Sequence, residues 1–148
     1  MKYRFVQFFQ KYLANPPLKA AFRLGLIPLG YALLETVGRK SGHLRRNPVG
    51  DGRVGGEFWI VSEHGARAGY VRNAEAHPRV RVKVRDGLRT RWLSGTAHLL
   101  PGDDPRERQR WLASRRFGAR LNAAAVRGFG TDLLTLRIDL DPSGRETP

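Results

Sequence analysis

The sequence contains no cysteine, which excludes disulfides, thiolate nucleophiles and cysteine-ligated zinc or iron–sulfur centres. It is also poor in acidic residues, with 13 Asp and Glu against 27 Lys and Arg and a net charge of +14. This imbalance indicates an anionic partner, but charge alone leaves nucleic acid, anionic lipid and an anionic small molecule open. The longest uncharged apolar run, residues 24–34, is about half of the roughly 20 residues that a membrane span needs. We therefore expect a cytoplasmic protein.

Several motifs of metal and nucleotide chemistry are missing as well. The four histidines do not fall at metal-ligand spacing and no HExxH motif is present, so no metal site is expected. Gly50, Gly52 and Gly55 form a literal G-x-G-x-x-G. A dinucleotide-binding loop must open a helix, whereas the residues that follow read as a strand. We interpret these glycines as a hairpin turn.

Hydrophobic periodicity divides the 148 residues into strands and helices of one α+β domain. The predicted strands are residues 31–40, 46–52, 57–65, 79–85, 88–100 and 132–140, and the predicted helices are residues 3–13, 68–78 and 104–130. Hairpins interleaved with helices favour an antiparallel sheet or small barrel with helices packed outside.

The N-terminal segment, residues 1–30, carries five basic and no acidic side chains. Its first helix is amphipathic and is expected to end at Asn15-Pro16-Pro17. Such a segment either contacts the inner face of the cell membrane peripherally through residues 1–17 or packs on its own domain. The predicted organisation is this segment, a domain at residues 31–141 and a tail at residues 142–148.

The strand at residues 79–85 alternates valines with four cations. A row of cations could follow a nucleic-acid backbone, but cations also keep an edge strand from pairing with other chains. No aromatic residue in this run is available to stack on a base. We expect a solvated edge strand and no nucleic-acid partner.

The stretch VGRKSGHLRRNP, residues 37–48, is the most distinctive in the chain. Gly38 and Gly42 allow a tight turn, and the cations on either side can converge on one anion. Like charges at such spacing repel by about 1 kcal/mol or more, which a bound phosphate or carboxylate would relieve. The alternative is a solvated basic turn. The converging cations are Arg39, Lys40, Arg45 and Arg46.

The pattern G-R-K-[ST]-G-x-x-R-x-N-P at residues 38–48, followed by FWIVSEHG, GYVRNAEAHPRVRVKV and TDLLTLRIDL, resembles the deazaflavin-dependent nitroreductase family. Its members are split-barrel oxidoreductases that use the deazaflavin coenzyme F420. The resemblance covers residues 33–140. It implies an α+β, mostly antiparallel split β-barrel with helices outside and an N-terminal amphipathic helix.

The resemblance also implies a coenzyme site. The motif would hold the acidic tail of F420, with Arg46 as an auxiliary cation, and residues 47–48 would border the ring. The implied cofactor-binding residues are Arg39, Lys40, Ser41, Arg45, Arg46, Asn47, Pro48, Glu63, His64, Gly65 and Asn73. Flavin mononucleotide (FMN), which has one phosphate and no acidic tail, is the alternative cofactor.

Members of this family transfer a hydride to quinones, nitroaromatics or activated enones, so a small-molecule acceptor is implied. Tyr70 and Ser62 are candidate catalytic proton donors. The apolar residues Leu121, Val126 and Phe129 are candidates for the substrate pocket. Split-barrel proteins often pair through the sheet, so a homodimer is one expected assembly.

Overall fold

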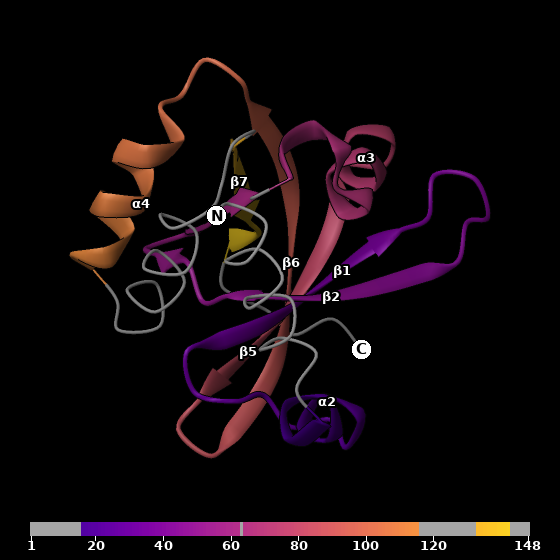
Figure 1. Ribbon diagram of the computed structural model, residues 1–148. Coiled ribbons are helices and arrows are strands. Elements are labelled where there is room, and N and C mark those ends of the chain that lie inside the picture. The colour runs from indigo at the N-terminus through magenta and orange to yellow at the C-terminus, as the bar shows by residue number, and fades with distance from the viewer. Residues whose placement is uncertain (1–15, 63, 116–132, 143–148) are drawn as a thin grey trace.

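The computed structural model describes residues 16–62, 64–115 and 133–142. Its strands form one seven-stranded antiparallel sheet in the order β2-β1-β5-β6-β7-β4-β3, which curls into a half-barrel (Figure 1). The strands are β1 (Tyr31–Val37), β2 (Leu44–Gly50), β3 (Arg53–Val54), β4 (Glu57–Ser62), β5 (Arg79–Asp86), β6 (Arg89–Leu100) and β7 (Leu134–Leu140). The predicted α+β split barrel is confirmed.

The described helices are α2 (Pro16–Arg23), α3 (Gly69–Ala76), α4 (Pro105–Ala113) and the short 3-10 helix η1 (Gly65–Arg67). Helices α2 and α3 lie at opposite ends of the sheet, and α4 lies to its side (Figure 1). Helix α2 begins at Pro16, where the N-terminal helix was expected to end, because proline is suited to the first helical position. The predicted helix at residues 3–13 and residues 116–130 of the predicted helix at residues 104–130 lie outside the described residues.

The core lies between the strands and α3. Val80, Val82 and Val84 on β5 are buried as their alternation predicted. They pack with apolar residues of β1, β4 and β7. A second apolar cluster lies under α4, where the rings of Trp59 and Trp111 meet edge to face at 5.5 Å.

The prediction of a solvated edge strand at residues 79–85 is wrong, because β5 is hydrogen-bonded to β1 on one side and β6 on the other. Its outward cations bind to the protein itself. Arg81 pairs with Glu35 at 2.7 Å. An aromatic ring from the neighbouring strand also lies among them, since Arg81 and Lys83 sit 4.5 Å and 5.8 Å from the centre of the Trp92 ring.

The glycines at residues 50–55 form the turn region between β2 and β4, as predicted, and a strand follows them. Gly52 is required by close approach of two backbones. Its carbonyl accepts a hydrogen bond from the Trp59 amide at 2.9 Å, and a Cβ at this position would lie 1.9 Å from the Trp59 carbonyl oxygen. No other residue type fits here without movement of β4.

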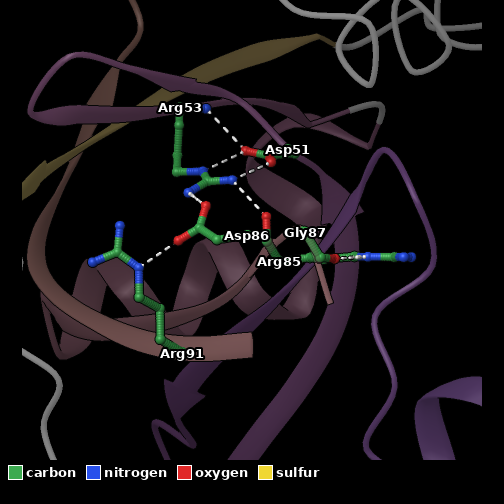
Figure 2. A network of polar contacts seen from close by, with 6 residues as sticks. All are labelled: Asp51, Arg53, Arg85, Asp86, Gly87 and Arg91. Carbon is green, nitrogen blue, oxygen red and sulfur yellow. Dashed lines mark hydrogen bonds and ion pairs between the residues drawn. The ribbon is translucent and has the colours of Figure 1, made fainter. Parts of the chain in front are cut away.

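A polar network fixes the β5–β6 hairpin beside β3 (Figure 2). Arg53 binds Asp51 at 2.9 Å and Asp86 at 2.8 Å, and Asp86 also accepts from Arg91 at 2.6 Å. Hydrogen bonds and charge from both arginines hold the pKa of Asp86 below its usual value. The turn between β5 and β6 is therefore anchored by two arginines.

Candidate functional site

The basic turn, residues 38–46, links β1 to β2 and is shaped by its own hydrogen bonds. The Gly38 amide donates to the His43 carbonyl at 2.7 Å, and Gly42 adopts a positive φ of 73°. The Ser41 hydroxyl oxygen accepts from the His43 amide at 3.1 Å. The turn thus holds its backbone without a ligand, while its cations lie around a cavity.

This cavity measures about 600 Å³ and lies between the basic turn, β2 and the first turn of α3. Its lining residues are Gly38, Arg39, Lys40, Ser41, Leu44, Arg45, Arg46, Asn47, Gly69, Tyr70 and Asn73. Four of these are cations and none is a carboxylate, so the cavity is strongly electropositive. The structure thus brings together most of the residues that the motif predicted.

Asn73 fixes the position of Arg39 inside this cavity. The Asn73 carboxamide oxygen accepts from the Arg39 amide at 3.2 Å and from its guanidinium at 3.0 Å. The carboxamide nitrogen donates to the Thr36 hydroxyl at 3.2 Å, and Asn73 is only 5% exposed. The Nε atom of Arg39 is buried and has no hydrogen-bond partner. Asn73, which the family resemblance predicts as a coenzyme contact, lines the cavity and also orients a cation within it.

The N-terminus of α3 is a feature of the cavity that sequence reasoning missed. Ala68 occupies the capping position, no side chain caps the helix, and Gly69 and Tyr70 at this end line the cavity. The first-turn amides and the helix dipole give this end a partial positive charge that favours anions. The signal was available in the sequence, because the predicted helix begins at Ala-Gly instead of at Ser, Thr or Asp.

Arg46 differs from the other cations because a buried carboxylate partly neutralises it. Glu35 is 4% exposed and accepts from Arg46 at 3.0 Å and from Arg81 at 2.7 Å. Burial raises the pKa of Glu35, but the hydrogen bonds and charges of both arginines outweigh it and hold the pKa below its usual value. This geometry suits Arg46 to the auxiliary role that the family resemblance implies.

Four predicted residues do not line the cavity. Ser62 is fully buried at the end of β4, where its hydroxyl donates to the Gly65 carbonyl at 3.1 Å, and His64 is exposed beside η1. Pro48 is half-buried on β2. Gly65, in η1, is the fourth of these residues. Ser62, His64 and Gly65 lie at the end of β4 or just after it, and β5, β6 and β7 separate β4 from β1 in the sheet. Four further predicted residues lie outside the described part of the chain: Glu63, Leu121, Val126 and Phe129.

Within residues 16–62, 64–115 and 133–142, no three His, Asp or Glu side chains gather in a way that could hold a metal ion. A search of the same residues for membrane spans found no helix of sufficient length and apolarity.

Solved structures with a similar fold include proteins of several descriptions. A protein described as an F420-H2 dependent reductase (FDR-A) is 23% identical, with a TM-score of 0.51 over 74% of this chain and 94% of that chain. HutZ, described as the heme storage protein from Vibrio cholerae, is 16% identical, with a TM-score of 0.54 over 86% of this chain and 91% of that chain. A protein described as a domain-swapped dimer is 21% identical, with a TM-score of 0.52 over 89% of this chain and 98% of that chain.

A search of curated proteins found no match. The family comparison is decisive because it covers most of the sequence, including the basic turn and α3. Residues 15–141 match the F420H(2)-dependent quinone reductase family, and the chain therefore belongs to this family.

Proposed function

We propose that the protein transfers a hydride from the reduced deazaflavin coenzyme F420 to an electron-poor acceptor of the quinone, nitroaromatic or activated enone class. The observation that carries this proposal is the carboxylate-free cavity in which Arg39, Lys40 and Arg45 meet the uncapped end of α3. Family membership supports a reductase that depends on F420.

The cavity fits the acidic part of the coenzyme. Arg39 lines the cavity and is held in place by Asn73 before any ligand binds. A phosphate or carboxylate oxygen would bind the Arg39 guanidinium through a charge-assisted hydrogen bond. Lys40 and Arg45 are exposed and can follow a longer acidic tail. FMN, which ends in a single phosphate, would use fewer of these cations.

Bound F420 would supply the hydride from its reduced ring, and the side chains bind, orient and deliver a proton. The exposed cations would bind the tail and leave the ring free to meet the acceptor. Tyr70 lines the cavity at the start of α3, whereas Ser62 is buried with its hydroxyl bonded. We therefore assign the proton that the reduced acceptor takes up to the Tyr70 hydroxyl.

The direct test is a titration of the full chain with oxidised F420, in which binding is monitored by the intrinsic tryptophan fluorescence. The Lys40→Ala/Arg45→Ala variant should bind at least about 30-fold more weakly, since two charged contacts are lost. A matched control, Arg89→Ala/Arg110→Ala, removes the same charge outside the cavity lining and should bind as the wild type does. Equal losses in both variants would contradict the proposed clamp. Tight binding of FMN but not F420 would point to the alternative cofactor.

The role of Tyr70 is tested separately by steady-state kinetics of Tyr70→Phe with a quinone and a nitroaromatic. We expect kcat to fall by about 100-fold while the affinity for F420 stays unchanged. Unchanged kcat would assign the proton to water.

A further inference from the structure

Four leucines at one end of the molecule project into solvent. Leu24, Leu26 and Leu29 follow α2 and are 76%, 58% and 69% exposed, and Leu88 in the β5–β6 turn is 96% exposed. We call these four residues the leucine patch. Strand β1 runs from this end, where Gly30 precedes it, to the basic turn at its other end. The leucine patch and the electropositive cavity are thus separated by the length of one strand.

The two segments that carry the leucine patch are bound to each other. The Arg85 guanidinium donates to the Gly87 carbonyl at 2.7 Å and to the Ile27 carbonyl at 3.2 Å. The Lys83 amino group donates to the Gly25 carbonyl at 3.2 Å. Figure 1 shows the loop after α2 beside the tip of the β5–β6 hairpin. Residues about 60 positions apart in the sequence therefore form one continuous surface.

The segments that carry these leucines are held in place by buried side chains and hydrogen bonds. Ile27, between Leu26 and Leu29, is 3% exposed and anchors the segment, and the Leu26 amide donates to the Ala21 carbonyl at 2.9 Å. The turn that carries Leu88 is fixed by the arginines that bind Asp86 (Figure 2). Apolar side chains held outward in this way mark an interaction surface.

The rim of the leucine patch is cationic. Arg23 and Arg89 are exposed beside the leucines, and Lys83 and Arg85 lie beneath them. The acidic residue at this rim, Asp86, is bound by two arginines, and residues 20–30 contain no acidic residue. The surface therefore presents apolar side chains surrounded by net positive charge.

We propose that the leucine patch docks on an anionic lipid surface. Leucines would enter the interface between headgroups and acyl chains, while the surrounding cations contact anionic headgroups. A second copy of this chain fits less well, because two cationic rims would face each other and repel. Docking at this end leaves the cavity at the far end of β1 in water, where an acidic coenzyme can enter it.

The test measures co-sedimentation of the full chain with vesicles of phosphatidylglycerol and phosphatidylcholine in equal parts, at physiological salt. The variant Leu24→Ser/Leu26→Ser/Leu88→Ser should bind at least about 10-fold more weakly, because each leucine contributes apolar transfer free energy. Leu44→Ser, at the basic turn, changes the exposed leucine at the other end of β1 and should bind as the wild type does. Thermal unfolding and the F420 titration verify that the triple variant is folded.

Charge is tested in the same assay. Arg89→Glu, at the rim, should weaken binding by about fivefold or more, and Arg110→Glu on α4 by less. Failure of the wild type to bind would overturn the proposal. So would equal binding of the triple variant, or binding that is lost only when residues 1–15 are deleted. A triple variant that changes the sedimentation coefficient from dimer to monomer while vesicle binding persists would assign the leucine patch to a second copy. The affinity for F420 is measured in a separate titration, so a negative result with vesicles does not contradict the proposed function.

Discussion

Replacing Asn73 by alanine separates two roles that this residue could have in the cavity. If Asn73 is a direct coenzyme ligand, its replacement should lower the affinity for F420 and change little else. If Asn73 orients Arg39, its replacement should lower the free energy of unfolding as well. The structure supports the second role, because all of the hydrogen bonds of its buried carboxamide described above go to Arg39 and Thr36.

The magnitude follows from the bonds that are removed. One of them involves the charged guanidinium and contributes about 1.5–3 kcal/mol, and the bonds to the Arg39 amide and the Thr36 hydroxyl contribute about 0.5–1.5 kcal/mol each. Because Arg39 is half-buried, its guanidinium can form hydrogen bonds with water in the variant and so recover part of the lost stabilisation. We expect Asn73→Ala to lower the free energy of unfolding by about 2–4 kcal/mol and the F420 affinity by about 10-fold.

The assay combines urea unfolding with the F420 titration and adds two variants of Thr36, which is buried and does not line the cavity. Thr36→Val removes the acceptor for the Asn73 amide and should lower both stability and affinity, whereas Thr36→Ser keeps the hydroxyl and should change both less. The reasoning is refuted if Asn73→Ala changes stability by less than about 0.5 kcal/mol while affinity falls, or if Thr36→Val leaves affinity untouched.

Three further predictions concern stability. Glu35→Gln should lower the free energy of unfolding by about 1–3 kcal/mol at pH 7. Because the folded pKa of Glu35 is depressed, its contribution is complete above the unfolded pKa and disappears as pH falls through the folded value. Urea unfolding should therefore show wild type and variant converging below about pH 4. Gly52→Ala should lower the melting temperature strongly, because its Cβ would collide with the Trp59 carbonyl, whereas Gly102→Ala, which meets open space, should not. Arg53→Met should cost about 3 kcal/mol at neutral pH by removing the guanidinium that binds both the buried Asp51 carboxylate and Asp86; a loss below about 1 kcal/mol would contradict this account of Figure 2.

The sequence predicted those parts of the site that depend on local spacing. The basic turn, its two glycines and its cations lie within eleven residues, so the motif was sufficient to locate one wall of the electropositive cavity. The alternation of valines on β5 likewise predicted its buried face. These features need no knowledge of which strands are neighbours.

Features that depend on contacts between distant segments were predicted wrongly or not at all. Asn73 lies 34 residues from Arg39, and the hydrogen bonds of its carboxamide depend on a contact between two segments that the sequence pattern does not reveal. The place of β5 inside the sheet depends on pairing with β1, which alternation along one strand does not reveal. Trp92 similarly meets the cations of β5 through cross-strand neighbours.

The cations of the cavity differ in how firmly they are held before a ligand binds, and this difference determines which kind of anion suits them. Arg39 is fixed by Asn73, so little conformational entropy is lost when an anion meets it, and it can set the position of one phosphate or carboxylate. Lys40 and Arg45 are exposed and must be ordered on binding, so each gives less net affinity but can reach acidic groups at different distances. A ligand with one invariant anionic group and a variable acidic tail matches this combination. A single terminal phosphate would engage Arg39 and gain little from the exposed cations, so the affinity that Lys40→Ala/Arg45→Ala loses should be larger for F420 than for FMN.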